Sequence, residues 1–312
     1  MTKTSNNYLD FYSSSASEEG PHLLIIAGVH GDEFEPIIAA TNLVNRLQNK
    51  YIKGKVTILP IANIIAYDIG KRCGTDQKDL ARTFPGKAMG SITEKIAKSV
   101  TELIQQADFL IDLHTGGTLF DLMPLTGYLL HPDKEVLAKQ KAMAKAFNLP
   151  LIWGTDATAQ GRTLSVARDY NIPAIYAECR GGLHAKTSTI HLYEEGCMNV
   201  MKHLKMLNSS FTMQNPEIWL EDYTPGQGHL QTKLPAPDNG IFVPSLQLGE
   251  KVKIGTELGY ILNPVLNKKT KIIIEEDGIL FMLRISSRVS IGESLGGILP
   301  ILRKGKKTVY AQ

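Results

Sequence analysis

The sequence contains little cysteine, little tryptophan and little net charge, and it has no long run of apolar residues. Only three cysteines and two tryptophans occur among its 312 residues. The cysteines are Cys73, Cys179 and Cys197, an odd number without the short spacing of a metal-binding cysteine motif. This pattern does not suit a disulfide framework and favours a reducing compartment.

The charges of the chain nearly balance, with 34 Lys and Arg against 31 Asp and Glu and a net charge of +3. The basic clusters at 268–271 and 303–307 are short and lack interleaved aromatic residues, so we expect no nucleic-acid partner. Residues 1–20 are polar and lack the apolar core of a signal peptide, and no apolar run reaches membrane-spanning length. We therefore expect a soluble cytoplasmic protein without a membrane partner.

The first 210 residues alternate between short apolar runs and segments with apolar residues at helical spacing. The runs that predict strands are 22–27, 55–63, 107–114, 128–130 and 172–178, and the segments that predict helices are 34–47, 91–106, 134–147, 163–170 and 188–206. This alternation predicts an α/β domain over residues 1–210. Residues 1–20 read as a tail or an edge segment, and residues 64–90 as a long irregular loop of the kind that is often functional.

The pattern changes after residue 216, where glycine, proline and short β-branched runs replace the helical spacing. The frame Val-x-Ile-Gly-x-x-Leu-Gly-x-Ile-Leu occurs at residues 252–262 and again at 289–299. An internal repeat of this kind indicates two similar units. We expect a small all-β domain over residues 216–312, built from two hairpin units.

Metal-binding residue types follow three of the predicted strands. His30 and Glu33 come just after the first strand of the α/β part, and His114 and Glu178 end two later strands. In open α/β sheets, ligands bind beyond the carboxyl ends of the strands, where these residues should meet. Zinc accepts imidazole nitrogen and carboxylate oxygen, and a hydrolytic zinc site keeps one position for water. His30, Glu33 and His114 are therefore the predicted zinc ligands, although His30 and Glu33 alone would suit a surface pair at a helix start.

Neighbouring charged residues fit the same site. Asp112 lies two residues before His114, on the same face of the strand, and could hold the other ring nitrogen of that histidine. Arg72 and Arg82 lie in the loop at 64–90, and an always-charged arginine can stabilise an oxyanion. For Arg72 a solvated surface charge is the alternative. Tyr128 and Arg162 are further candidates for the lining of the cleft.

Taken in order, these motifs resemble a known family. They are His30-x-x-Glu33, the loop ending Asp79-Leu80-Ala81-Arg82-Thr83-Phe84-Pro85-Gly86, Asp112-Leu113-His114 and the later Glu178. The arrangement resembles the succinylglutamate desuccinylase and aspartoacylase family, relatives of the zinc carboxypeptidases, over roughly the first 210 residues. The resemblance implies a zinc carboxypeptidase-like mixed sheet flanked by helices. It also implies a C-terminal β domain similar to biotinyl and lipoyl barrels.

The resemblance also implies a role for each matching residue. One zinc ion per chain would be held by His30, Glu33 and His114, with Glu178 as general base, Arg72 polarising the scissile carbonyl and Arg82 holding a substrate carboxylate. Ala81 stands where the family usually has asparagine. One hydrogen-bond donor for the substrate carboxylate is therefore missing, which leaves the substrate class open.

Three hypotheses about function follow. The leading one is a zinc-dependent hydrolase that removes the acyl group from an N-acyl amino acid or a similar small amide carrying a carboxylate. A metallocarboxypeptidase acting on short peptides is the alternative. The third and most remote hypothesis is a non-enzymatic carrier. Lys268 and Lys269 lie between the two β units, where a carrier would bear its modified lysine, but they lack the flanking methionines of a biotinyl site. The long loops and the β domain are compatible with a homo-oligomer.

Overall fold

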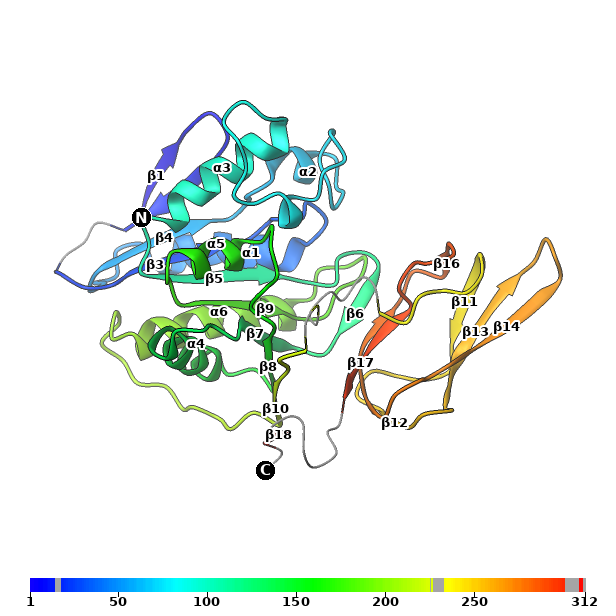
Figure 1. Ribbon diagram of the computed structural model, residues 1–312. Helices are drawn as coiled ribbons and strands as arrows, with labels where there is room; N and C mark the ends of the chain where they lie inside the picture. Colours follow the sequence, from blue (N-terminus) through cyan, green and yellow to red (C-terminus); the bar gives the residue numbers. More distant parts are fainter. Residues whose placement is uncertain (15–17, 225, 227–232, 301–308, 311–312) are drawn as a thin grey trace.

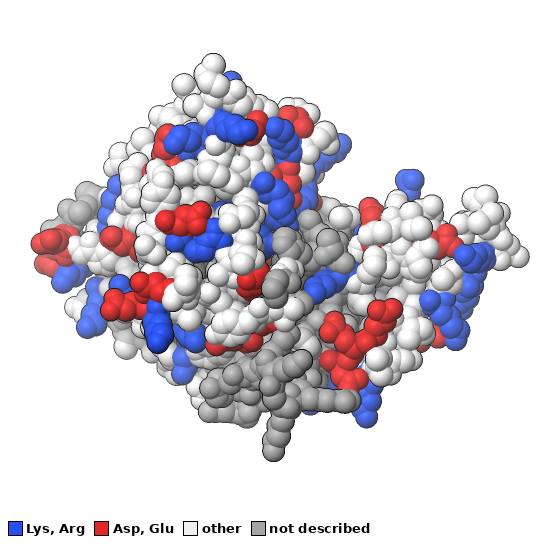
Figure 2. All heavy atoms as spheres, in the orientation of Figure 1, with Lys and Arg blue, Asp and Glu red and all other residues white. Residues whose placement is uncertain are grey.

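The structure is a computed structural model that describes residues 1–14, 18–224, 226, 233–300 and 309–310. It consists of a large mixed sheet covered by helices and a smaller β part beside it (Figure 1). On the face shown in Figure 2, basic and acidic side chains are interspersed. The basic cluster at 303–307 lies outside the described residues.

The large sheet has ten strands in the order β1-β2-β4-β3-β5-β9-β7-β8-β10-β18. These are β1 (Thr2–Ser5), β2 (Asp10–Ser13), β3 (His22–Ile26), β4 (Lys55–Leu59), β5 (Phe109–His114), β7 (Leu125–Leu129), β8 (Leu151–Thr155), β9 (Ala174–Glu178), β10 (Ile218–Glu221) and β18 (Val309–Tyr310). The central pairs β4–β3, β3–β5 and β5–β9 are parallel, whereas β9–β7 and the outer pairs β1–β2, β2–β4 and β10–β18 are antiparallel. The predicted mixed α/β fold is confirmed, and residues 1–20 supply edge strands.

Helices cover both faces of this sheet. They are α1 (Phe34–Arg46), α2 (Ile64–Asp68), the 3-10 turn η1 (Leu80–Arg82), α3 (Ile92–Ile104), α4 (Lys134–Phe147), α5 (Thr163–Asp169) and α6 (Thr187–His203). Apolar residues of α1, α4 and α6 pack with Leu23 and Ile25 of β3, and those of α3 and α5 pack with Leu24 and Ile26. A central strand buried on both faces is apolar throughout, which explains why its run shows no alternation. No helix in the described ranges is long and apolar enough to cross a membrane.

The C-terminal part contains two small antiparallel sheets. Their strands are β11 (Gly240–Pro244), β12 (Lys251–Val252), β13 (Glu257–Asn263), β14 (Lys268–Ile273), β15 (Gly278–Arg284), β16 (Arg288–Val289) and β17 (Gly296–Pro300). The two repeat units exchange their short strands, because β12 of the first unit pairs with β15 and β16 of the second pairs with β11. Additional antiparallel sheets follow the α/β part as expected; closure into a barrel stays a prediction.

Two strand pairings join the two parts of the chain. β6 (Phe120–Leu122), from the α/β part, pairs with β15, and β10, from the region 216–312, pairs with β8 of the large sheet. β18 then pairs with β10 at the edge of that sheet. An apolar cluster that includes Trp153, Leu122, Phe281 and Met282 fills the junction. The division of the chain into domains 1–210 and 216–312 stays a prediction. Strands from each of these two ranges pair with strands from the other.

Candidate active site

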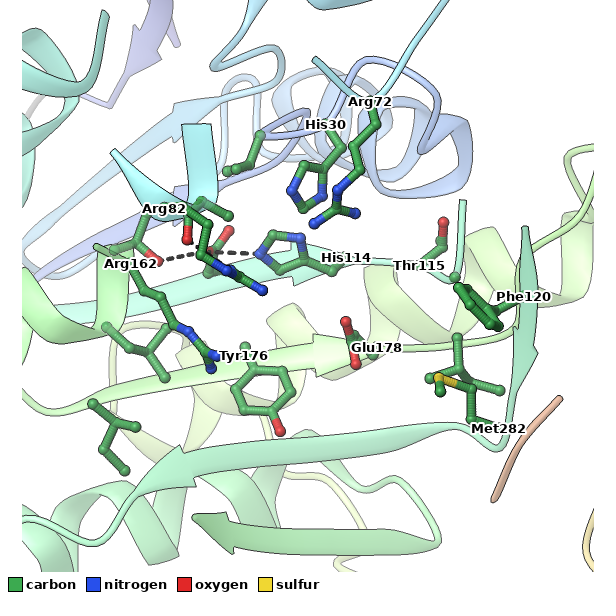
Figure 3. Close-up of a pocket in the computed structure, with 18 residues that line it drawn as sticks. His30, Arg72, Arg82, His114, Thr115, Phe120, Arg162, Tyr176, Glu178 and Met282 are labelled. Atoms are coloured by element: carbon green, nitrogen blue, oxygen red, sulfur yellow. Dashed lines mark hydrogen bonds and ion pairs between the residues drawn. The ribbon is translucent and has the colours of Figure 1, made fainter. Parts of the chain in front are cut away.

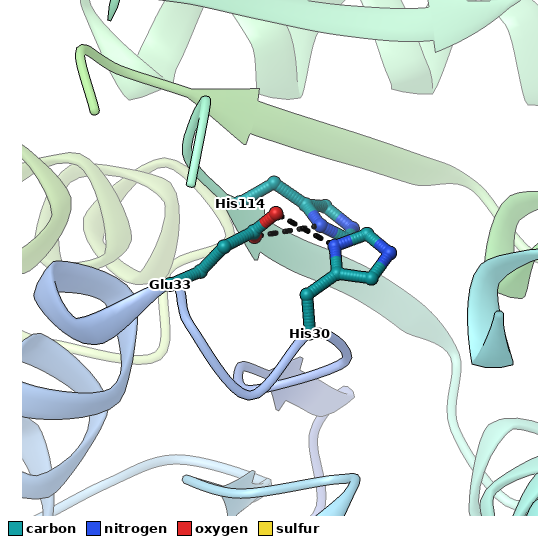
Figure 4. A group of neighbouring side chains, drawn as sticks. All are labelled: His30, Glu33 and His114. Carbon is teal, nitrogen blue, oxygen red and sulfur yellow. Dashed lines mark hydrogen bonds and ion pairs between the residues drawn. The ribbon is translucent and has the colours of Figure 1, made fainter. Parts of the chain in front are cut away.

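The three predicted metal ligands lie together where β3 and β5 end (Figure 4). β3 and β5 are parallel neighbours, so His114 at the end of β5 lies beside the loop that follows β3. Gly28 starts that loop with φ +63°, and a side chain there would meet the backbone of Ile61 at 2.9 Å. Only glycine adopts this turn easily, and the turn brings His30 and Glu33 back over His114.

Glu33 lies between the two histidine rings. Its Oε1 is 2.6 Å from Nδ1 of His30, and its Oε2 is 3.2 Å from Nδ1 of His114. The N–H of Thr115 also donates to Oε2 at 3.0 Å. Burial opposes ionisation of this carboxyl, but the charges of His30 and His114 and their hydrogen bonds outweigh burial and hold the pKa of Glu33 well below its usual range. The carboxylate is therefore available as a ligand.

Each histidine has a second carboxylate on its far side. Asp112 lies 3.0 Å from Nε2 of His114, so the contact predicted from the strand alternation is confirmed. Asp79, which belongs to one of the sequence motifs but had no predicted role there, lies 3.2 Å from Nε2 of His30. Burial disfavours its ionisation, but the hydrogen bond from His30 and the charge of Arg72 prevail, and the pKa of Asp79 is held well below normal. An acceptor on the far ring nitrogen fixes the orientation of a metal-binding imidazole.

This donor set fits a zinc ion. The ligand atoms of His30, Glu33 and His114 all lie within 4.8 Å of one another. When Nε2 of His30 donates its proton to Asp79, and Nε2 of His114 donates its proton to Asp112, Nδ1 of each ring presents a lone pair to a Glu33 oxygen. Two acceptors this close require a proton or a cation between them. Two imidazoles and one carboxylate are the protein ligands of several hydrolytic zinc sites, which leave a fourth position for water.

Glu178 faces the same place from the neighbouring strand. It lies opposite His114 in the parallel pair β5–β9, and both line a cavity of about 120 Å³ (Figure 3). Its Oε2 is buried and has no hydrogen-bond partner among the described residues. Burial raises the pKa of the Glu178 carboxyl, and the nearby Glu33 raises it further against the opposing effect of His114. A carboxylate held this way is suited to accept a proton.

Three arginines reach this cavity (Figure 3). Arg72 holds Asp79 through Nε and Nη2 at 3.2 and 3.0 Å, and its Nη1 lies 3.7 Å from Glu33. Arg82 donates to the carbonyl of Ala81 at 2.7 Å, and burial together with the adjacent charge of Arg162 lowers its pKa. Figure 3 shows Arg82 and Arg162 on the side of Glu178 that faces away from Phe120, and Arg72 beside His30.

The structure places all six predicted site residues in one region, but it corrects one prediction about the lining. Arg162 lines the cavity, whereas Tyr128 does not. The Tyr128 ring is buried. Its hydroxyl donates a hydrogen bond to Glu221 at 2.7 Å and accepts one from Trp219 at 2.9 Å. Ala81 lines the cavity from η1 and offers no polar side-chain atom.

Further residues line the cavity that were not predicted from the sequence to do so. They are Thr163 and Tyr176 on one side, and Phe120, Leu122 and Met282 on the other. Thr163 donates a hydrogen bond to Asp112, which in turn holds His114. Met282 belongs to β15, so the C-terminal part supplies one wall of the site. Only the pairing of β6 with β15 brings it there.

The chain is similar to a known family over most of its α/β part. The family profile of the succinylglutamate desuccinylase/aspartoacylase catalytic domain matches residues 19–204. An N-alpha-acetyl-L-2,4-diaminobutyric acid deacetylase from Halomonas elongata is 29% identical over 292 residues, covering 91% of this chain and 83% of the relative. An aspartoacylase family protein from Mesorhizobium loti has 27% identity and a TM-score of 0.76, with 95% of this chain and 90% of that chain covered.

The fold also matches a more distant crystal structure. The product-bound ectoine utilization protein EutE from Ruegeria pomeroyi has a TM-score of 0.84 at 23% identity, covering 93% of this chain and 88% of that chain. At this identity the likeness concerns the fold. The profile match, together with the order of the site residues along the chain, shows that the chain belongs to the succinylglutamate desuccinylase/aspartoacylase family.

Proposed function

We propose that this protein is a zinc-dependent deacylase that hydrolyses the amide bond of an N-acyl amino acid or a similar small amide. The observation that carries the proposal is the convergence of His30, Glu33 and His114 beside Glu178, whose Oε2 is buried and has no hydrogen-bond partner among the described residues. The deacetylase from Halomonas elongata, whose match extends over most of both chains, supports a deacylation.

Each side chain then has a task that its position allows. When bound, zinc would supply a Lewis acid for the carbonyl and lower the pKa of a water molecule. Glu178 accepts a proton from the attacking water and delivers it to the leaving nitrogen, as its raised pKa favours. The guanidinium of Arg72 lies beside Glu33 and can stabilise negative charge on the carbonyl oxygen.

The remaining cations suit a carboxylate on the substrate. Arg82 and Arg162 both line the cavity. Burial of Arg82, together with the positive charge of the nearby Arg162, lowers the pKa of Arg82. A carboxylate between two guanidinium groups makes charge-assisted hydrogen bonds and relieves their repulsion. Arg162 therefore offers a donor where the alanine at position 81 offers none, and an N-acyl amino acid with a free carboxylate remains a suitable substrate.

The same geometry ranks the other hypotheses lower. A cavity of about 120 Å³ closed on one side by Met282 suits a small amide better than an extended peptide. For a carrier, the two candidate lysines are already engaged: Lys268 pairs with Asp238 at 2.8 Å, and Lys269 lies 3.7 Å above the ring of Tyr260. The cytoplasmic location and a homo-oligomeric state stay predictions.

Metal analysis combined with a substrate panel tests the proposal. Purified protein should contain about one zinc per chain by elemental analysis, and should hydrolyse members of a panel of N-acyl amino acids. Chelation should abolish the activity, and added zinc should restore it. Metal-free protein that keeps full activity, or a preference for tripeptides over N-acyl amino acids, would contradict the proposal.

A further inference from the structure

The cavity has two chemically different ends, with Glu178 and His114 between them (Figure 3). Arg82 and Arg162 line one end. Phe120 and Met282 line the other, and Figure 3 shows them on the side of Glu178 that faces away from these arginines. A charged group would find hydrogen-bond partners at the first end, whereas the second end offers apolar surface and would penalise a charge.

The apolar end is built from both parts of the chain. β6 and β15 pair antiparallel with Leu122 opposite Met282 and Phe120 opposite Arg284. The register of β15 against β17 shifts between Leu280 and Met282, an irregularity that redirects side chains.

The neighbour of Met282 fixes the direction of its side chain. Phe281 packs edge-on against Trp153, with ring centroids 5.3 Å apart, while Met282 lines the cavity. Both side chains are almost completely buried. Met282 is thus held in place by the strand on either side and is not a mobile surface residue.

The two ends can be assigned to the two substituents of the scissile carbonyl. In an N-acyl amino acid, the nitrogen side carries the carboxylate, which the arginine end binds. The carbonyl carbon must lie near His114 and Glu178, so the acyl chain extends toward the opposite end. Resting on the proposed function, we infer that Phe120, Leu122 and Met282 form an acyl subsite for a short uncharged acyl group, and that Met282 limits its length.

This assignment separates acyl groups by charge as well as by size. A dicarboxylic acyl group such as succinyl would bring a second carboxylate against the apolar side chains of Phe120 and Met282. The nearby guanidinium of Arg284 lies 5.9 Å from the centroid of the Phe120 ring, but it already donates to Glu293 and to backbone carbonyls, and it does not line the cavity. A longer alkyl chain would collide with the Met282 side chain. Each extra methylene in a closed apolar pocket typically changes kcat/KM by about tenfold or more.

A chain-length series tests the inference. One amino acid that the wild type accepts as its N-acetyl derivative is prepared with formyl, acetyl, propionyl, butyryl, hexanoyl and succinyl groups, and kcat/KM is measured for each. The wild type should favour acetyl over butyryl and over succinyl by about tenfold or more. Met282→Ala should raise the butyryl-to-acetyl ratio by about tenfold without improving succinyl.

The adjacent residue provides the matched control. Leu283 lies next to Met282 on β15, but its side chain packs in the core of the C-terminal part, so Leu283→Ala should leave the ratio unchanged. If Met282→Ala does not fold, Leu122→Ala on the facing strand opens the same wall and should produce the same shift.

Each outcome bears on the inference. An unchanged ratio in a folded, active Met282→Ala variant overturns it, as does wild-type hydrolysis of the succinyl or hexanoyl compound at the acetyl rate. If the wild type hydrolyses no N-acyl amino acid at all, the proposed function fails and the inference falls with it. The two failures are therefore distinguishable.

Discussion

Nε2 of His30 lies 3.2 Å from a carboxylate oxygen of Asp79, a residue 49 positions further along the chain. Asp79 also accepts from the guanidinium of Arg72 and from the N–H of Ala81, at 2.8 Å for the latter. One carboxylate therefore orients a proposed metal ligand, an arginine of the cavity and the turn η1. This relationship makes Asp79 a positioning residue for the whole metal side of the site.

Asp79→Asn should weaken zinc binding by about 10–100-fold, because the outer partner of a ligand histidine contributes this much to metal affinity. Competition with a chromogenic chelator measures the effect. Asp76→Asn is the matched control in the same loop, since Asp76 accepts from Thr93 and does not line the cavity. Equal zinc affinity of Asp79→Asn and the wild type would refute the role of Asp79.

Arg82→Ala should raise KM for an N-acyl amino acid by about 10–100-fold, because a hydrogen bond to a charged group is lost. The same variant should lose far less against the carboxamide analogue, in which the substrate carboxylate is neutral. Steady-state kinetics on both compounds separate the two cases. Equal losses on both would mean that Arg82 does not bind the carboxylate.

The activity should depend on pH through Glu178. A general base works only when ionised, and burial raises the pKa of this carboxyl above its usual value of 4.5. A base with a raised pKa becomes protonated, and stops working, at a higher pH than usual. As the pH is lowered, kcat/KM should therefore fall with a midpoint above pH 4.5. Circular dichroism at each pH shows whether the chain stays folded. Constant kcat/KM down to about pH 4 in folded protein would be inconsistent with this role.

Gly127→Ala should destabilise the fold by about 1–3 kcal/mol, because the tightly packed site has no room for an added methyl group. A side chain at position 127 would come within 2.1 Å of the Tyr176 ring, which lies opposite it in the β7–β9 pair. Denaturant unfolding measures the loss. Adding Tyr176→Ala should make the further cost of Gly127→Ala much smaller, and full additivity of the two changes would argue against the clash.

Much of this fold and of the metal site could be predicted from the sequence. His30, Glu33, His114 and Glu178 follow buried strands, and parallel strands bring such residues to one edge of a sheet. Asp112 followed from the alternation of a strand. The helix predicted at 134–147 from its apolar spacing matches α4, and the structure shows that Asp133 caps its first turn.

The residues that sequence reasoning missed depend on long-range pairing. Asp79 sits in a segment without periodicity, so no local pattern shows that it faces His30. Met282 reaches the cavity only because β15 pairs with β6, a contact between strands far apart in the chain. Tyr128 was assigned to the cleft wrongly, because the apolar run that contains it does not reveal which face of the sheet carries the cavity.

The substitution Glu178→Gln tests the central claim most directly, because it removes the proposed base and preserves the size of the side chain. The variant should still bind about one zinc per chain, and its kcat on an accepted N-acyl amino acid should fall by about 10²–10⁴-fold. Undiminished turnover in a zinc-loaded Glu178→Gln variant would contradict the account.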